Sequence, residues 1–222
     1  MTVRDVFRGA ALERRASADL IAAGVRDRIL AGELVPDDPL REAELAEAFG
    51  VARNTVREGL RLLTQGGLAT YEMHRGVTVR RHTAAEVAAV FEVRAIIELA
   101  AARRAGTIEA WEAARLRRVL EDSEASDAIG DVKGVMTANL EFHRELVRLL
   151  GNPKLDDIFN QLLAELRLIL TPLDRDVGGA WLGRNRELLG LLVEGDPAAF
   201  TARLQRYLDD SRRDVLARIG AA

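Results

Sequence analysis

Apolar positions recur with helical spacing on both sides of a single glycine near the start of the chain. Val56, Leu60 and Leu63 follow one another at spacings of four and three, which places them on one face of a helix. Gly50 comes just before this helix, and glycine readily adopts the positive φ that ends a preceding helix. The pattern predicts two short helices joined by a tight turn, which is a helix-turn-helix.

The outward face of the second helix carries groups that suit DNA. With the apolar stripe facing inward, four polar side chains point out: Arg53, Asn54, Arg57 and Arg61. Arginine pairs with guanine edges or with phosphates, and asparagine can donate to a base and accept from it. A solvated helix face would also be charged, but its charges usually alternate in sign, and here Glu58 is the single acid among the arginines. The pattern therefore favours DNA recognition.

A short hairpin is predicted directly after this helix. Residues 68–72 and 77–80 have strand composition and are joined by residues 73–76. A hairpin behind a recognition helix commonly reaches the neighbouring groove or backbone, so we expect it to be a wing. Six arginines and two glutamates lie between residues 51 and 81, a net charge of +4, whereas the whole chain carries −3. The predicted DNA contacts are Arg53, Asn54, Thr55, Arg57 and Arg61 from the helix, and His74, Arg75 and Gly76 from the wing tip.

From residue 83 onward the pattern is helical. Thr83 and Glu86 form a capping box, and the triplets at 151–153 and 195–197 each combine a glycine stop, a cap and a proline. The predicted helices span about residues 84–105, 107–125, 131–150, 154–170, 180–194 and 198–219. The expected fold is mainly α, with an N-terminal winged helix-turn-helix over 1–82 and an all-α antiparallel helix bundle over 83–222.

Several hydrogen-bonding side chains fall on the inward stripes of the predicted bundle helices: Arg94, Asn139, His143, Asn185 and Tyr207. Each alone could be an ordinary satisfied core residue, and Arg94 could pair with Glu98 one turn away. Burying all of them without partners would cost about 1–3 kcal/mol each. Together they predict a polar cavity that holds water or a ligand.

Composition indicates in which compartment of the cell the protein is expected. The chain has 222 residues, of which 48% are hydrophobic, enough for the cores of two domains. It contains no cysteine, which excludes disulfides and thiolate metal sites. The first 16 residues lack the apolar stretch of a signal peptide, and no apolar run is long enough to span a bilayer. These features predict a cytoplasmic protein without membrane contact.

The segment Gly50-Val51-Ala52-Arg53, continued by Val56-Arg57-Glu58, resembles the winged-helix domain of the GntR family of bacterial transcription regulators. The helices downstream resemble the FCD domain, the ligand-binding domain of the FadR-type branch. The resemblance covers nearly the whole chain and implies a homodimer bound to double-stranded operator DNA. Two positions depart from the family: its usual Pro-Gly reads Pro36-Asp37-Asp38-Pro39 here, and Thr55 stands where proline is frequent. Neither departure removes a DNA-contacting group.

The resemblance also implies a metal, held in FCD domains by an aspartate and three histidines. Those positions correspond to Asn139, His143, Asn185 and Tyr207, so one of the four ligands is kept. The replaced donors are those that a transition metal prefers. We therefore expect no cofactor; were zinc or nickel bound, the ligands would be Asn139, His143 and Asn185. Without the carboxylate, Arg94 and a protonated His143 would leave the cavity positive, which favours a small organic acid as effector.

The resulting prediction is a dimeric repressor whose bundle binds a small, carboxylate-bearing metabolite and thereby changes its hold on the operator. One alternative is an effector-independent DNA-binding regulator whose bundle serves only to dimerise. Another is an enzyme with His143 as general base. No nucleophile or paired carboxylate accompanies His143 on the inward stripes, and the chain has no glycine-rich phosphate loop, so the pattern disfavours an enzyme.

Overall fold

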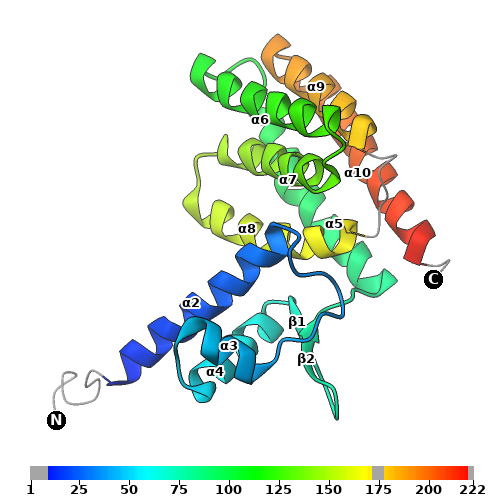
Figure 1. Cartoon of the computed structure of the whole chain (residues 1–222). Helices are drawn as coiled ribbons and strands as arrows, with labels where there is room; N and C mark the ends of the chain where they lie inside the picture. Colours follow the sequence, from blue (N-terminus) through cyan, green and yellow to red (C-terminus); the bar gives the residue numbers. More distant parts are fainter. Residues whose placement is uncertain (1–9, 172–177, 220–222) are drawn as a thin grey trace. The chain divides into compact units, whose positions relative to one another are not determined.

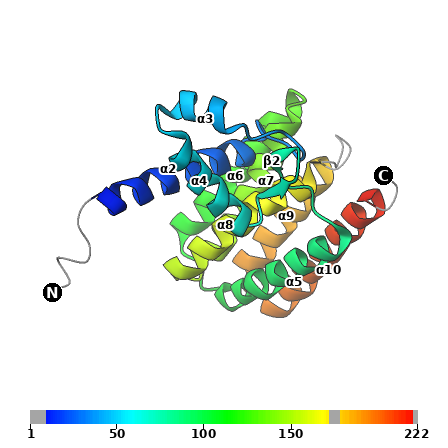
Figure 2. The ribbon, with the colours of Figure 1, turned by 90° about the horizontal axis from the view of Figure 1, so that it is seen from below.

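The computed structural model describes residues 10–171 and 178–219 (Figures 1 and 2). By its internal contacts the chain divides into two compact units. The first unit spans residues 1–81 and the second spans 82–222. The division falls between Arg81 and His82, one residue before the boundary drawn from the sequence. Among the helices of these ranges, none combines the length and the apolar character needed to cross a membrane.

From residue 10 onward, the first unit is built from three helices and a hairpin. Its elements, in chain order, are α2 (Ala10–Leu30), α3 (Glu42–Phe49), α4 (Arg53–Gln65), β1 (Ala69–Glu72) and β2 (Gly76–Val79). The strands pair antiparallel, with Ala69 opposite Val79 and Glu72 opposite Gly76. This is the predicted helix-turn-helix followed by a wing.

The turn between α3 and α4 forms as the sequence predicts. Gly50 has a φ of 66°, and its N–H donates to backbone carbonyls of α3, which closes the helix. Beyond the turn, Val56, Leu60 and Leu63 of α4 are at most 2% exposed. The expected apolar stripe is confirmed, and it fixes which face of α4 remains in solvent.

A glycine sets the distance between α2 and α4, which pack against each other. A Cβ atom built on Gly59 of α4 would lie 2.8 Å from Cγ2 of Ile21 and 3.1 Å from the carbonyl oxygen of Ala18, both on α2. Real Cβ atoms do not approach carbon so closely, so the missing side chain lets the two helices meet.

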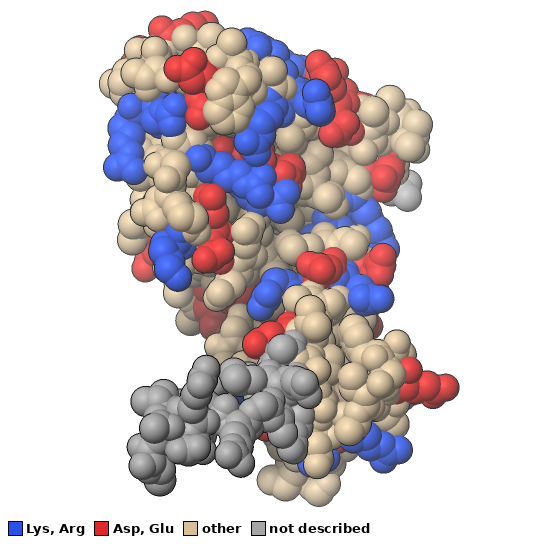
Figure 3. Space-filling view, turned by 90° about the vertical axis from the view of Figure 1, so that its left-hand side faces the viewer, with Lys and Arg blue, Asp and Glu red and all other residues tan. Residues whose placement is uncertain are grey.

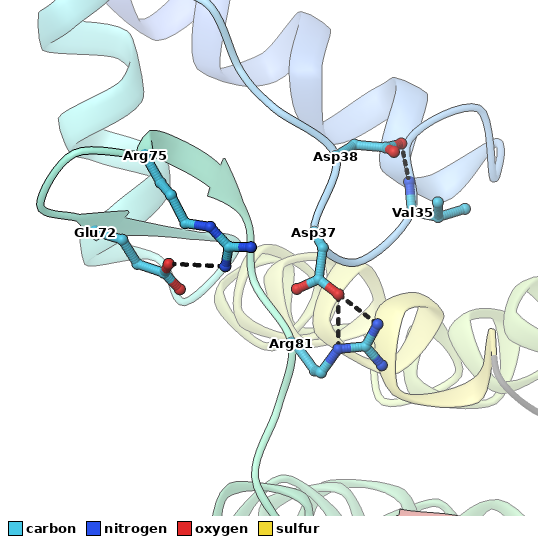
Figure 4. A network of polar contacts seen from close by, with 6 residues as sticks. All are labelled: Val35, Asp37, Asp38, Glu72, Arg75 and Arg81. Atoms are coloured by element: carbon cyan, nitrogen blue, oxygen red, sulfur yellow. Dashed lines mark hydrogen bonds and ion pairs between the residues drawn. The ribbon is translucent and has the colours of Figure 1, made fainter. Parts of the chain in front are cut away.

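The loop before α3 runs beside the wing (Figure 4). The N–H of Asp37 donates to the carbonyl of Val79 over 2.9 Å, and the N–H of Val79 donates to the carbonyl of Asp38 over 2.9 Å. Asp37 has a φ of 76°, a conformation that glycine adopts most easily, and its carboxylate pairs with Arg81. The aspartate therefore occupies the turn where the family pattern has Pro-Gly.

The second unit is a bundle of α-helices. Its elements are α5 (Ala84–Leu99), a 3₁₀ turn η1 (Ala100–Arg104), α6 (Ala110–Ala128), α7 (Val132–Arg148), α8 (Pro153–Leu170), α9 (Gly178–Glu194) and α10 (Pro197–Ile219). The predominantly helical fold class is confirmed. Helix α7 packs against α5, α6, α8 and α9, so it is the central helix of the bundle (Figure 1).

Three helix boundaries differ from the sequence prediction by three residues or more. The helix expected over 84–105 changes to 3₁₀ geometry at Ala100, and the helix expected over 107–125 begins at Ala110 and ends at Ala128. The later start has a local cause, because Glu109 and Glu112 form a reciprocal capping box there. The predicted capping box of Thr83 and Glu86 at the start of α5 is confirmed.

Candidate functional sites

Helix α4 presents its polar edge to solvent. The side chains of Arg53, Asn54, Arg57 and Arg61 are exposed, and Thr55 is half-buried. No side chain caps the first turn of α4, whose N-cap residue is Ala52. Uncapped N–H groups and the positive end of the helix dipole favour an anion such as a phosphate.

Arg57 is tied to the preceding helix. Its Nε donates to Oε1 of Glu42 over 2.9 Å, and its Nη2 donates to Oε2 over 2.8 Å. Its Nη1 donates to Oδ1 of Asn54 over 3.5 Å. Glu42 lies at the first position of α3, so this contact joins the two helices of the helix-turn-helix.

Two other predicted contact arginines pair with acids close in the chain. Arg61 lies 3.1 Å from Glu58, and Arg75 lies 3.2 Å from Glu72 (Figure 4). All four side chains are between 46% and 78% exposed. Exposed pairs of this kind contribute about 0–1 kcal/mol, so a phosphate can replace the acid at small cost.

The tip of the wing has an unusual backbone conformation. His74 has a φ of 73°, which a side chain other than glycine rarely adopts, and Gly76 has a φ of 81°. His74 and Arg75 are both exposed, and Gly76 is half-buried. The turn therefore holds its two polar side chains out into solvent, at a local strain of about 1–2 kcal/mol.

A chain of charged and polar contacts lies inside the bundle. Arg94, Glu98 and His143 are each 0% exposed. The Nε of Arg94 donates to Oε1 of Glu98 over 2.5 Å, and the Nδ1 of His143 donates to Oε2 of Glu98 over 2.6 Å. Glu98 thus joins α5 to the central helix α7.

A second buried set of contacts adjoins the first. The Nδ2 of Asn185 and the hydroxyl of Tyr207 both donate to Oδ1 of Asn139, over 2.9 Å and 3.0 Å. The rings of His143 and Tyr207 are stacked with their centroids 4.9 Å apart. All five residues predicted to face the core are buried, and the fold brings them together from α5, α7, α9 and α10.

Several polar atoms of this centre have no hydrogen-bond partner among the residues that the structure describes. They are Nη1 and Nη2 of Arg94, Nδ2 of Asn139, Nε2 of His143 and Oδ1 of Asn185. Because Nδ1 of His143 donates to a carboxylate, the neutral ring has Nε2 as an acceptor. The centre therefore offers N–H donors on Arg94 and Asn139, and acceptors on His143 and Asn185.

A depression lies on the bundle surface, between α6 and α9. It has a volume of about 490 Å³, and Glu124 and Arg186 form an ion pair on its wall. None of the residues predicted for effector binding lines it. On the bundle face drawn in Figure 3, basic and acidic side chains are interspersed, so this face presents no uniform charge.

Comparison with protein families covers both units. Residues 89–210 match the FCD domain, and residues 17–79 match the bacterial regulatory proteins of the gntR family. The chain belongs to the GntR family, with an FCD domain. GntR proteins are regulators, and the enzyme alternative is thereby excluded.

The relatives of this GntR chain have regulator names. A regulator in an unstable DNA locus of Streptomyces ambofaciens is 31% identical over 202 residues, which cover 85% of this chain and 82% of that protein. The gluconate operon transcriptional repressor of Bacillus licheniformis is 27% identical over 152 residues, covering 68% of this chain. The match spans only 62% of the length of that repressor and of the regulator YdhC of Bacillus subtilis.

Solved structures agree with the assignment. A GntR transcriptional regulator from Rhodococcus sp. RHA1 superposes with a TM-score of 0.82 at 29% identity, covering 91% of this chain and 98% of that one. McbR/YncC from E. coli has a TM-score of 0.77 at 18% identity, which supports the fold alone.

The metal that the FCD resemblance implies does not fit this GntR chain. Among the described residues, no three of the types histidine, cysteine, aspartate and glutamate come together. The four positions that correspond to the family's ligands supply one imidazole, two amides and a phenol. The nearby carboxylate of Glu98 is already engaged by Arg94 and His143. Neutral amide and phenol donors beside a guanidinium are a poor site for zinc or nickel.

The expected positive charge of the polar centre is wrong. Glu98 supplies an anion that is missing from the expected set of inward groups, and it lies against both Arg94 and His143. Burial, together with the neighbouring Arg94 cation, lowers the pKa of His143 and favours its neutral form. The Arg94 guanidinium and the hydrogen bond from His143 hold the pKa of Glu98 below its ordinary value despite burial, so Glu98 is ionised. At neutral pH the centre therefore consists of the Arg94–Glu98 ion pair, which has no net charge, and a neutral His143 imidazole.

Glu98 could have been found in the sequence. It lies four residues after Arg94 and next to Ile97, so it falls on the inward face of the same helix. From the sequence, Glu98 is expected only as a partner for Arg94. Its contact with His143, which lies 45 residues away, depends on how α5 meets α7.

Proposed function

We propose that this chain is a transcription regulator that binds operator DNA through α4 and the wing. The observation that carries the proposal is the uncapped start of α4, where Arg53 and Arg57 are exposed beside a hairpin that holds His74 and Arg75 in solvent. Arginines at the start of a recognition helix read base edges, and a wing contacts the adjacent backbone or minor groove. The proposed contacts are those predicted from the sequence.

We further propose that the protein acts as a homodimeric repressor in the cytoplasm, where its DNA is. Two relatives support repression, because they are named as repressors of the gluconate and galactonate operons. A dimer would place two recognition helices on two half-sites of a pseudo-palindromic operator.

The effector that we propose is a small organic acid bound in the polar centre of the bundle. Arg94 uses Nε for Glu98, and its guanidinium carbon lies 5.6 Å from the centre of the Tyr207 ring. Nη1 and Nη2 have no hydrogen-bond partner within reach among the described residues, so a second carboxylate can bind there. The acceptors on His143 and Asn185 suit hydroxyl groups of the same molecule. Gluconate and galactonate, for which the two relatives are named, combine a carboxylate with hydroxyls. No metal takes part in this proposal.

The second candidate keeps the DNA-binding role and removes the effector. Several of the buried groups satisfy one another, since Glu98 serves both Arg94 and His143 and Asn139 serves both Asn185 and Tyr207. On this view the centre only specifies the packing of the bundle, and the bundle only dimerises.

Replacing Arg57 by alanine tests the DNA-binding role. We expect Arg57→Ala to weaken binding to a duplex selected from a random pool about 10- to 100-fold, because a bidentate arginine contact is worth about 1–3 kcal/mol. The side chain is 63% exposed, so the melting temperature should stay nearly unchanged. Fluorescence anisotropy and calorimetry measure the two quantities.

Arg118→Ala is the matched control. It removes the same charge from an exposed position on α6 of the bundle, and it should leave DNA affinity unchanged. If the Arg57 and Arg118 variants bound DNA equally well, Arg57 would not be part of the DNA interface.

A further inference from the structure

The contact between Arg57 and Glu42 differs from the ion pairs of the other two predicted contact arginines that pair with an acid, Arg61 and Arg75. Arg61–Glu58 and Arg75–Glu72 are single contacts between residues three apart. Arg57–Glu42 joins residues 15 apart on two helices and uses both carboxylate oxygens. Glu42 is 33% exposed, less than any side chain of those two pairs. Two parallel hydrogen bonds fix the guanidinium plane, which a single contact cannot do.

The contact leaves part of Arg57 free. A guanidinium has five N–H groups. Glu42 takes one on Nε and one on Nη2, and Asn54 takes one on Nη1. Two N–H groups at the exposed end remain, and they are held in a defined direction.

Two opposite roles are open to a carboxylate in this place. It could compete with DNA for Arg57 and repel phosphates, so that its removal would strengthen binding. It could instead hold the arginine in the orientation that DNA requires, which reduces the conformational freedom lost on binding. The half-buried position of Glu42 and its two-point contact favour the second role.

We propose that Glu42 is a positioning residue that aims Arg57 at the DNA, so that both affinity and base discrimination depend on it. The inference rests on the placement of Arg57 at DNA proposed above. It assigns a DNA-binding role to an acid on α3, the first helix of the helix-turn-helix. This residue is not among those predicted from the recognition helix and the wing.

The test compares substitutions that remove the same charge from the same helix. Glu42→Gln and Glu42→Ala loosen or remove the contact. Glu44→Gln is the control, because Glu44 pairs with Arg41 and does not touch Arg57. Each full-length variant is titrated with a duplex selected from a random pool by the unsubstituted protein and with a scrambled duplex, at several salt concentrations.

We expect Glu42→Gln and Glu42→Ala to bind the selected duplex about tenfold more weakly than Glu44→Gln does, which corresponds to about 1.4 kcal/mol. Affinity for the scrambled duplex should not fall, so the ratio of the two affinities should drop. In an Arg57→Ala background, Glu42→Gln should change neither quantity, because the group that it positions is gone. A general loss of structure would reduce selectivity whether or not Arg57 is present. A loss that occurs only when Arg57 is present therefore excludes that explanation.

Other results would overturn the inference. If the Glu42 variants match Glu44→Gln or bind more tightly, Glu42 competes with DNA or is neutral. If they lose selectivity equally in the Arg57→Ala background, Glu42 acts by another route. Failure of the proposed role of Arg57 is distinguishable, since Arg57→Ala alone would then bind as tightly as the unsubstituted protein.

Discussion

At the scale of single residues, the most constrained group is the buried Arg94–Glu98–His143 chain. Its three side chains are fully buried, so each charge depends on the next for stabilisation. Glu98 contacts a guanidinium through one oxygen and an imidazole through the other. The imidazole is thereby fixed in one tautomer, with Nε2 turned away from Glu98.

This arrangement predicts a loss of stability on acidification. The pKa of His143 is lowered in the folded protein, whereas the unfolded chain has an ordinary value of about 6.5. Below about pH 6.5 the unfolded chain therefore binds a proton that the folded bundle does not, and the free energy of unfolding falls by up to about 1.4 kcal/mol per pH unit. The effect ends below the lowered pKa. Glu98 adds a further loss in the same direction, because its lowered pKa makes the unfolded chain take up its proton first.

Urea unfolding at pH 7.5 and pH 5.5 measures the effect. Both tryptophans, Trp111 and Trp181, lie in the bundle, so their fluorescence follows this unit. His143→Gln should lose most of the difference between the two pH values. His74→Gln, at the exposed wing tip, should retain it. An unchanged pH dependence in His143→Gln would contradict the lowered pKa.

At the scale of elements, the recognition helix is positioned by its contact with α2. Gly59 allows that contact, since any side chain there would meet Ile21 and Ala18. The position is inside a helix, where glycine is about 1 kcal/mol less favourable than alanine. Close packing therefore requires glycine at this position, although helix propensity favours alanine.

Gly59→Ala should lower the stability of the DNA-binding unit by about 1–3 kcal/mol, because overpacking outweighs the gain in propensity. Calorimetry measures the change. Gly50→Ala is an informative comparison, because a Cβ at Gly50 would have no atom within 4 Å and only its φ of 66° would be strained. That strain should cost about 1–2 kcal/mol and leave the distance between α2 and α4 unaltered. A higher melting temperature for Gly59→Ala would show that α2 can move away freely.

At the scale of the whole molecule, the proposed DNA and effector sites lie in different units. If an acid in the bundle changes operator affinity by some factor, the operator must change acid affinity by the same factor. The coupling can therefore be measured from either side.

We expect a thermal-shift screen of organic acids, including gluconate and galactonate, to yield an acid that stabilises the bundle and weakens operator binding. Calorimetric titration of that acid with and without operator should give the same factor as operator titration with and without the acid. Arg94→Lys keeps the positive charge but loses the planar guanidinium that can bind a carboxylate with two hydrogen bonds. The variant protein should therefore bind the operator normally and respond less to the acid. If no acid binds, the effector-independent candidate stands. If acids bind unsubstituted and Arg94→Lys protein equally, Arg94 is not the anchor.

The sequence by itself determined the features that depend on neighbours along the chain. The spacing of Val56, Leu60 and Leu63 set the inward face of α4 and therefore its exposed arginines. Gly50 set the turn, and Thr83 with Glu86 set the start of α5. Hydrophobic periodicity, helix capping and glycine φ depend on residues close together in the chain, so they can be predicted without knowledge of the fold.

Only the tertiary structure decided which side chains meet across helices. Nothing local to Glu98 reveals that it accepts from His143, and nothing local to Glu42 reveals that it holds Arg57. The inward position of Glu98 can be inferred from the sequence, but its simultaneous contacts with Arg94 and His143, which set the charge of the bundle centre, cannot. Such contacts depend on the rotation and crossing of packed helices, which the sum of distant packing interactions fixes.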